Sequence, residues 1–212
     1  MLELNNLYNM DCMDGMQQFP DGYFDLAIVD PPYGIKRFER TDACPTRIMK
    51  YGQMNTVNNA IPTKEYFTEL MRVSKNQIVW GWNHLSDMLP PTSEFIFWDK
   101  QQSVENFSAG EVAWTSFKQV ARVFRFDYGG FRSSESGTRI HPTQKPVALY
   151  KWLLTKYAKE GDKILDTHVG SASSLIACHD LHFDFIGFEI DETYYKAAIE
   201  RMEQHFAQYT LF

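Results

Sequence analysis

The 212-residue sequence is poor in cysteine and contains no long uninterrupted apolar run. Cys12, Cys44 and Cys178 are widely spaced and form no Cys-x-x-Cys pair, which disfavours a disulfide framework or a zinc site. No run of apolar residues approaches membrane-spanning length, and the first residues do not have the pattern of a signal peptide. These absences predict free thiols, no metal and no membrane association, and we therefore expect a cytoplasmic protein.

Basic side chains are absent from the first 30 residues, and the whole chain carries a net charge of −6. They are concentrated in the segments 31–50 and 115–151, where they outnumber the acids. Such segments can neutralise nucleic-acid phosphates, although every protein surface carries some basic residues. The irregular segment 35–62 is predicted to be a loop that closes over bound substrate. The candidate nucleic-acid contacts are Lys36, Arg37, Arg40, Arg47, Arg132 and Arg139.

The length and the apolar content of 44% fit one globular domain, 1–212, without repeats or a linker. Short apolar runs alternate with helical patterns, which is typical of an α/β fold with a mostly parallel sheet. The sequence predicts strands at 7–12, 25–30, 77–82, 94–99, 161–166 and 184–189, and helices at 14–18, 63–74, 147–157, 175–179 and 192–208. The segments 111–115 and 122–126 alternate in polarity and predict an antiparallel pair at the edge of the sheet.

The segment that follows the strand at 25–30 is stiff and begins with an acid. Pro31 and Pro32 lack a backbone N–H and cannot continue a central strand, so they hold Asp30 and Tyr33 at its carboxyl end. Ligands bind at this edge of open α/β sheets. The Asp30 carboxylate and the Pro31 carbonyl can accept hydrogens from one exocyclic amino group, while Tyr33 stacks on the ring that carries it. The alternative is an acidic turn that merely ends a strand.

Two turns in the C-terminal half have the composition of ligand-binding loops. Residues 141–147 lead into a helix whose N-terminus, with Lys145, can attract a carboxylate, although a plain helix start is the alternative. Small residues follow the strand that ends at Asp166, and Glu189 ends the next strand. A tight turn lets the backbone approach a ligand, and an acid at the end of the next strand suits a ribose diol.

Four motifs resemble those of S-adenosylmethionine-dependent DNA amino-methyltransferases, which methylate adenine N6 or cytosine N4. They are Asp-Pro-Pro-Tyr at 30–33, His-Pro-Thr-Gln-Lys-Pro at 141–146, Leu-Asp-Thr-His-Val-Gly-Ser-Ala-Ser at 165–173 and Gly-Phe-Glu-Ile-Asp at 187–191. Their order, with the catalytic strand first, is similar to that of the circularly permuted β group. The resemblance covers nearly the whole chain. It implies a Rossmann-like class I methyltransferase fold, with a mostly parallel central sheet, an antiparallel edge strand and helices on both faces. A separate target-recognition domain is not evident.

The resemblance also implies a reaction and the residues that would carry it. A methyl group would pass from S-adenosylmethionine to adenine N6 in double-stranded DNA, with the target base flipped out of the duplex. The catalytic residues would be Asp30, Pro31, Pro32 and Tyr33. The cofactor would be bound by Asp11, Cys12, Asp30, Thr143, Lys145, Asp166, His168, Gly170, Ser171, Ala172, Ser173, Glu189 and Ile190. The alternatives are DNA cytosine-N4 or RNA adenine methylation, and an inactive methyltransferase-like subunit that binds nucleic acid. The same resemblance associates the chain with restriction–modification and allows a homodimer.

The cofactor loop departs from the family pattern Asp-Pro-Phe-x-Gly-Ser-Gly. Thr167, His168 and Ala172 stand in place of the proline, the phenylalanine and the second glycine. Ala172 adds only a methyl group, which is tolerable if the backbone keeps a negative φ there. Gly170 is then expected to be the critical glycine of this turn.

Overall fold

The computed structural model describes residues 1–34, 60–102, 108–127, 140–141 and 143–209. Most of the loop predicted at 35–62 lies outside these residues, together with Cys44 and the six candidate nucleic-acid contacts. Within the described part of the chain, no helix is long and apolar enough to cross a membrane. In the same residues, no three His, Cys, Asp or Glu side chains are grouped so that they could hold a metal ion.

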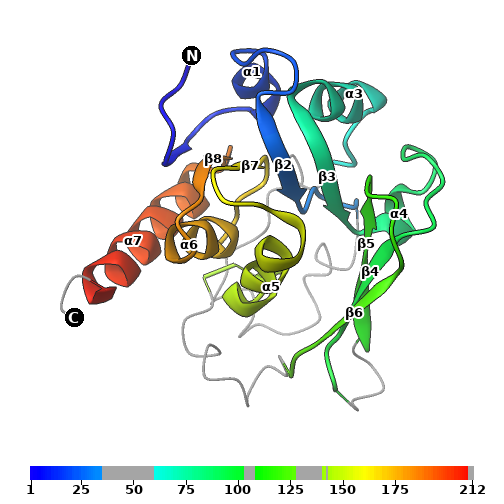
Figure 1. The fold of residues 1–212 in the computed structure, drawn as a ribbon. Coiled ribbons are helices and arrows are strands. Elements are labelled where there is room, and N and C mark those ends of the chain that lie inside the picture. Colours follow the sequence, from blue (N-terminus) through cyan, green and yellow to red (C-terminus); the bar gives the residue numbers. More distant parts are fainter. Residues whose placement is uncertain (35–59, 103–107, 128–139, 142, 210–212) are drawn as a thin grey trace, which may run out of the picture.

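Among the described residues, eight strands form one sheet in the order β1-β8-β7-β2-β3-β5-β4-β6 (Figure 1). The strands are β1 (Asn6–Tyr8), β2 (Phe24–Val29), β3 (Ser74–Trp80), β4 (Phe95–Asp99), β5 (Gly110–Thr115), β6 (Arg122–Arg125), β7 (Lys163–Asp166) and β8 (Asp184–Phe188). β5 runs antiparallel to both of its neighbours, β3 and β4, and the other described pairs are parallel.

Helices cover both faces of the sheet (Figure 1). They are α1 (Cys12–Met16), α3 (Lys64–Val73), α4 (Trp82–Leu85), α5 (Val147–Tyr157), α6 (Ser173–Asp180) and α7 (Glu192–Tyr209). Apolar residues of α5, α6 and α7 pack with one set of strand residues, and those of α1 and α3 pack with the alternate set. The central strands are therefore buried on both faces, which explains why they appear in the sequence as continuous apolar runs. The predicted α/β architecture is confirmed.

The order of the strands places a topological switch point between β2 and β7. These neighbours pair in parallel, with Leu26 opposite Ile164 and Ala27 opposite Leu165. From β2 the sheet continues through β3 on one side, and from β7 it continues through β8 on the other. At such a switch point the connections leave the carboxyl ends in opposite directions and open a ligand crevice. Asp30 follows β2 and Asp166 ends β7, so both acids lie at this crevice.

Three expectations about the strands are corrected. The segments 111–115 and 122–126 do not pair with each other, because β4 lies between β5 and β6. The reversed strand β5 is therefore inside the sheet and not at its edge. The first strand ends at Tyr8, because Asp11 caps α1 by accepting a hydrogen bond from the Met13 N–H at 2.8 Å.

Candidate active site

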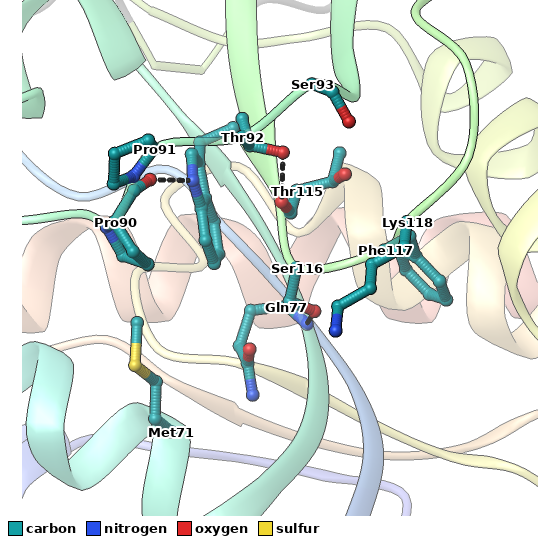
Figure 2. Close-up of a pocket in the computed structure, with 11 residues that line it drawn as sticks. Met71, Gln77, Pro90, Pro91, Thr92, Ser93, Thr115, Ser116, Phe117 and Lys118 are labelled. Atoms are coloured by element: carbon teal, nitrogen blue, oxygen red, sulfur yellow. Dashed lines mark hydrogen bonds between the residues drawn. The ribbon is translucent and has the colours of Figure 1, made fainter.

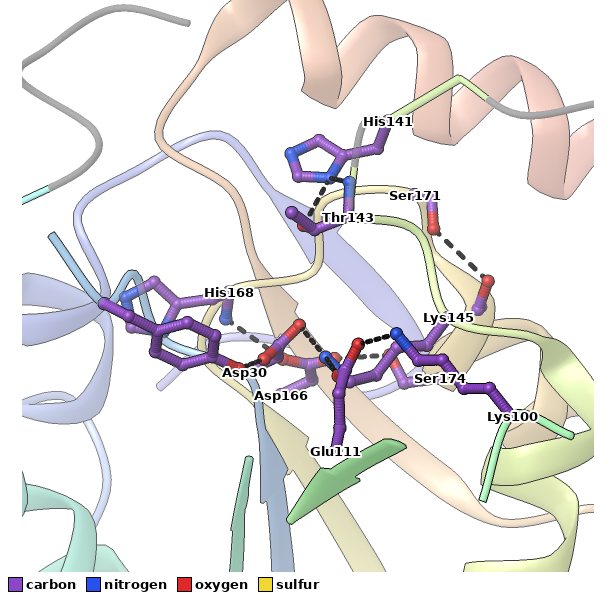
Figure 3. A network of polar contacts seen from close by, with 12 residues as sticks. Asp30, Lys100, Glu111, His141, Thr143, Lys145, Asp166, His168, Ser171 and Ser174 are labelled. Carbon is purple, nitrogen blue, oxygen red and sulfur yellow. Dashed lines mark hydrogen bonds and ion pairs between the residues drawn. The ribbon is translucent and has the colours of Figure 1, made fainter. Parts of the chain in front are cut away.

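Asp30 lies at the carboxyl end of β2. Its carboxylate contacts one side chain from its own loop and one from a distant part of the chain. Its Oδ2 forms an ion pair with Lys145 Nζ, and its Oδ1 accepts a hydrogen bond from the Tyr33 hydroxyl (Figure 3). The Asp30 side chain is only 16% exposed. A carboxylate oxygen can accept two hydrogen bonds, so each Asp30 oxygen keeps one acceptor position for a ligand.

Tyr33 belongs to the loop that follows β2, and its ring packs against Gly81, which follows β3, and against His84 of α4. It stacks on the His84 ring at a centroid distance of 5.3 Å and an interplanar angle of 18°. Gly81 makes room for it, because a Cβ built there would lie 2.0 Å from Tyr33 Cε1. Gly81 also has a φ of +76°, which favours glycine. Tyr33 is thus an aromatic platform fixed beside Asp30.

Lys145 is the buried centre of a cluster of four charges, in which its side chain is 3% exposed. Its Nζ lies 3.1 Å from Glu111 Oε2, and Lys100 Nζ lies 2.5 Å from Glu111 Oε1. Burial alone would lower the pKa of Lys145, but Asp30 and Glu111 raise it. Burial alone would raise the pKa of Glu111, but the two lysines lower it to about 2. Lys145 and Glu111 are therefore both charged at neutral pH, each paired with a group of opposite sign on either side.

Asp166 is buried in the turn that links β7 to α6. It accepts hydrogen bonds from the His168 N–H at 3.0 Å and from the Ser174 hydroxyl. Burial raises its pKa to about 7, although these two donors oppose the shift. The Asp166 carboxyl group is therefore about half-protonated near neutral pH.

The raised pKa of Asp166 predicts how stability depends on pH. An ordinary aspartate pKa lies near 3.8, so between about pH 4 and 7 the folded state binds this proton more tightly than the unfolded state does. The free energy of unfolding should therefore fall as the pH rises through this window, by up to about 1.4 kcal/mol per pH unit. Asp166→Asn removes the titration, so its stability relative to wild type should increase between about pH 5 and pH 8. Urea unfolding of the ligand-free protein at several pH values measures this difference.

Asp25→Asn is the matched control. Asp25 pairs with Lys75 at 2.6 Å and accepts from the Lys163 N–H at 2.9 Å, near the opposite end of β2. Burial opposes the shift, but these partners lower its pKa, so its contribution is already complete above about pH 5. The difference between Asp25→Asn and wild type should stay constant over the range in which that of Asp166→Asn grows. Equal behaviour of the two variants would contradict the prediction.

A cavity of about 340 Å³ opens beside the Asp30 loop. It is lined by Met10, Asp11, Cys12, Met13, Pro32, Ala60, Ile61, Pro62, Thr63, Tyr66, Thr167, His168, Phe188, Glu189 and Ile190. Five of the residues expected to bind the cofactor are among them, namely Asp11, Cys12, His168, Glu189 and Ile190. The structure thus brings together, in one cavity, residues from the start of α1 and from the ends of β7 and β8.

Glu189, which lines this cavity, accepts hydrogen bonds from two backbone N–H groups. Its Oε2 accepts from the Gly170 N–H at 2.8 Å, and its Oε1 accepts from the Asp191 N–H at 2.9 Å. Gly170 has a φ of +55°, in the left-handed region that favours glycine. The Ile190 N–H also donates to the Glu189 carboxylate, which keeps acceptor capacity for a ligand hydroxyl group.

His168 belongs to a chain of hydrogen bonds that enters the cavity wall. The hydroxyl oxygen of Tyr66, in α3, lies 2.6 Å from Thr167 Oγ1. Thr167 Oγ1 in turn lies 2.9 Å from His168 Nδ1. Burial lowers the pKa of His168 to about 4, so its ring is neutral at physiological pH. A neutral ring can lie beside a positively charged ligand without repelling it.

Several other expected cofactor residues are turned toward protein groups. Ser171 and Ser173 contact each other at 3.2 Å, and Arg201 of α7 donates to the Ser171 carbonyl and to the Ser173 hydroxyl. Thr143 is exposed and contacts His141 Nδ1 at 3.1 Å. These groups do not line the 340 Å³ cavity.

The condition placed on Ala172 is not met. Its φ is +61°, in the left-handed region, where it precedes α6 as the N-cap residue. A non-glycine residue in this region is strained, because its Cβ approaches the backbone. The side chain is fully buried, and the Ala172 N–H donates to the Val169 carbonyl at 3.1 Å. The turn therefore keeps the conformation that suits glycine, at a local cost of about 1 kcal/mol.

A larger cavity, of about 580 Å³, lies at the opposite edge of the sheet (Figure 2). It is bordered by Gln77 near the start of β3 and by Trp114 and Thr115 at the end of β5, which runs in reverse. The Trp114 indole N–H donates to the Pro90 carbonyl at 2.8 Å, and the Thr92 hydroxyl donates to the Glu94 carbonyl at 2.9 Å. Since these polar groups already bond within the protein and lie far along the strands from Asp30, the smaller cavity is the better candidate site.

Sequence reasoning missed four groups of the site. Tyr66 lies on the apolar face of α3 and is buried in the core, so its position in the helix does not reveal that its hydroxyl contacts Thr167. Gly81, Glu111 and Lys100 carried no motif. The acid at 111 begins a strand that alternates in polarity, and only its neighbours in the sheet reveal that it faces a buried lysine.

The fold and the cavity at the carboxyl ends of β7 and β8 define an α/β protein with a candidate ligand site at this edge of its sheet. A DNA methylase family model, N6_N4_Mtase, matches residues 75–200, which is more than half of the chain. The chain therefore belongs to this DNA methylase family.

Two curated relatives share parts of the sequence. The type II methyltransferase M.HpaI of Haemophilus parainfluenzae is 41% identical over 66 residues, which cover 31% of this chain and 21% of that protein. The type II methyltransferase M.BamHI of Bacillus amyloliquefaciens is 21% identical over an alignment of 234 residues, which covers 89% of this chain and 55% of that protein. The chain thus spans about half, or less, of the length of these relatives.

Solved structures agree on the fold. The M1.HpyAVI–SAM complex superposes with a TM-score of 0.58 at 18% identity, over 93% of this chain and 98% of that one. The PvuII DNA methyltransferase, described as cytosine-N4-specific, gives a TM-score of 0.62 at 12% identity, over 96% of this chain and 91% of that one. The expected class I methyltransferase fold is confirmed.

Proposed function

We propose that this chain is a DNA amino-methyltransferase that uses S-adenosylmethionine and methylates the N6 amino group of adenine. The observation that carries the proposal is the position of Asp30, with an acceptor position left on each oxygen, next to a cavity that Pro32 and Glu189 line. Membership in the DNA methylase family and the likeness to a SAM complex support it.

The cavity fits S-adenosylmethionine in size and in the chemistry of its walls. Its volume of about 340 Å³ lies within the usual range for small-molecule sites. Glu189 would accept hydrogen bonds from the ribose hydroxyls with its remaining acceptor capacity, and Asp11 and Cys12 would border the adenine. Phe188 and Ile190 supply apolar walls. When bound there, S-adenosylmethionine supplies an electrophilic methyl group on a positively charged sulfur, which leaves as a neutral thioether.

Asp30 and its neighbours would act on the nucleophile. The amino nitrogen of the target base is weakly nucleophilic, because its lone pair is delocalised into the ring. Hydrogen bonds from this amino group to Asp30 and to the Pro31 carbonyl would localise the lone pair as the new N–C bond forms. The nitrogen then gives up one proton, through the Asp30 carboxylate, to water. Tyr33, fixed by His84 and Gly81, would stack on the base after it has left the duplex.

The choice of adenine over cytosine rests on the aspartate at position 30, which is commoner in adenine enzymes of this kind. The second candidate is cytosine-N4 methylation, which the likeness to PvuII methyltransferase favours. The chain order, with β2 before β7, supports membership in the circularly permuted β group. The six basic residues proposed as phosphate contacts belong to segments for which the structure gives no description.

The decisive experiment is nucleoside analysis of methylated DNA. Duplex DNA treated with the protein and S-adenosylmethionine is digested, and the nucleosides are separated by mass spectrometry. N6-methyladenine is expected, at a rate that falls steeply as salt rises, because the basic segments release counterions on binding phosphate. A charge reversal at Arg37, Arg40 and Arg47 serves as the comparison and should weaken DNA binding far more than cofactor binding.

Each other outcome selects a different alternative. N4-methylcytosine without N6-methyladenine would refute the base assignment, and methylation of RNA in preference to DNA would refute the substrate. Cofactor binding without any methyl transfer would identify an inactive methyltransferase-like subunit.

A further inference from the structure

Glu111 makes contacts that no step of the proposed reaction has used. It lies near the start of β5, the reversed strand, and its carboxylate joins Lys145 at 3.1 Å to Lys100 at 2.5 Å (Figure 3). Glu111 is 31% exposed, whereas the lysine that it shares with Asp30 is almost fully buried. The contact therefore links a side chain at the rim of the cluster to the acid at the reaction site.

A buried ammonium group needs more than one anionic partner. Removing a lysine from water is costly, and the group tends to lose its proton instead. The Lys145 Nζ has three hydrogens, of which two point to the carboxylates of Asp30 and Glu111. The Trp80 ring offers its face to the same Nζ, with the centroid at 5.3 Å. Without Glu111, the proton on Lys145 would be held chiefly by Asp30.

We propose that Glu111 is a positioning residue, which keeps Lys145 charged and aimed at Asp30 Oδ2 so that Asp30 keeps its orientation toward the target amine. This role rests on the proposed function, because it assigns Glu111 a part in that reaction. Glu111 acts through Lys145 and touches neither the base nor the cofactor. Lys100 holds the second oxygen of Glu111 and so fixes the direction of the first.

Several titratable groups surround the Lys145 ammonium and have to be considered in its pH dependence. Those in and beside the cluster are Asp30, Tyr33, Lys100, Glu111, His141 and Asp166. The pKa of Tyr33 lies well above its ordinary value, because of burial and the nearby acids. Burial lowers the pKa of His141 to about 4, and the pKa of Asp166 is about 7. Glu111, His141 and Asp166 have already lost their protons at alkaline pH, so these three groups do not account for a change in rate there.

The experiment compares Glu111→Gln with wild type over a range of pH. Glutamine keeps the size of the side chain and removes its charge, so the pKa of Lys145 should fall. The ratio of kcat in the variant to kcat in wild type should therefore drop about tenfold or more between pH 7.5 and pH 10. Titration of isotope-labelled lysine side chains by NMR, in protein without cofactor or DNA, should show the same fall in the pKa of Lys145. Glu111→Asp keeps the charge on a shorter side chain. The ratio of its kcat to that of wild type should therefore also fall with rising pH, but by less.

Asp25→Asn is again the matched control, since it removes a carboxylate charge paired to a lysine outside this cluster. It should leave the ratio constant with pH. A merely structural Glu111 would lower the melting temperature and scale the rate equally at every pH. Should Glu111→Gln not fold, the shift in Glu111→Asp decides.

The outcomes separate this role from the function on which it rests. A wild-type chain that transfers no methyl group overturns the proposed function and this role together. An active wild type with a pH-independent ratio, or an unchanged lysine titration in both variants, overturns the role of Glu111 alone.

Discussion

Replacing Asp30 with alanine is expected to reduce methyl transfer by about 10²-fold or more, while cofactor binding remains close to that of wild type. Asp30 lies where β2 ends and points out of the core, so its loss removes an acceptor for the target amine. Rates measured under single-turnover conditions, with saturating cofactor, report the chemical step directly. Calorimetry of S-adenosylmethionine binding checks that the cavity survives.

Asp30→Asn is the better matched variant, because it keeps the size of the side chain and an oxygen that can accept from Lys145. Asparagine keeps one oxygen, which can face Lys145, but it loses the charge and turns the other acceptor oxygen into an amide donor. The asparagine variant should be destabilised less than the alanine variant and still lose most of its activity. Turnover within a few-fold of wild type in either variant would remove Asp30 from the mechanism.

Replacing Glu189 with alanine is expected to weaken S-adenosylmethionine binding by roughly 1–3 kcal/mol, which is about 5-fold to 150-fold in Kd. The variant loses the proposed bonds to the ribose. It also leaves the N–H groups of Gly170 and Asp191 without their acceptor, so the turn that borders the cavity loosens. Calorimetry gives the affinity, and thermal unfolding without ligand gives the cost to the fold.

Glu189→Gln separates the two causes. Glutamine keeps one acceptor oxygen for the turn but replaces the other with an amide that cannot accept from a hydroxyl. Its affinity should lie between those of wild type and Glu189→Ala. If both variants bind the cofactor as wild type does, Glu189 is only a structural partner of the turn.

The core elements of the fold could be predicted because their signals are local. Continuous apolar runs marked β2, β3, β7 and β8, since strands covered by helices on both faces have no polar face to expose. The expected ends of these strands agree with the structure to within a few residues. Pairing was less predictable. The alternation at 111–115 gave no indication that β4, earlier in the chain, would lie between β5 and β6.

The residues of the site divide in the same way. Asp30 and Glu189 could be placed at the functional edge, because each acid directly follows an apolar strand. The conformation of Ala172 could not, because its positive φ is imposed by the turn between β7 and α6 and not by the residue itself. Lys145 was expected to face the cofactor, and its side chain lies against Asp30 and Glu111.

The sequence by itself determined which family of DNA methylases the motifs resemble, the alternation of strands and helices, and the acids that end β2 and β8. Each of these depends on neighbours within a few positions, where prolines, apolar runs and small residues act directly on the backbone. The tertiary structure alone decided that the reversed strand β5 enters the sheet beside β3 and brings Glu111 to Lys145. Lys145 and Asp30 lie 115 positions apart in the chain, and the free energy of their contact depends on the burial that the folded sheet provides. No local pattern encodes that burial, so the charge cluster became visible only when the strands were in place.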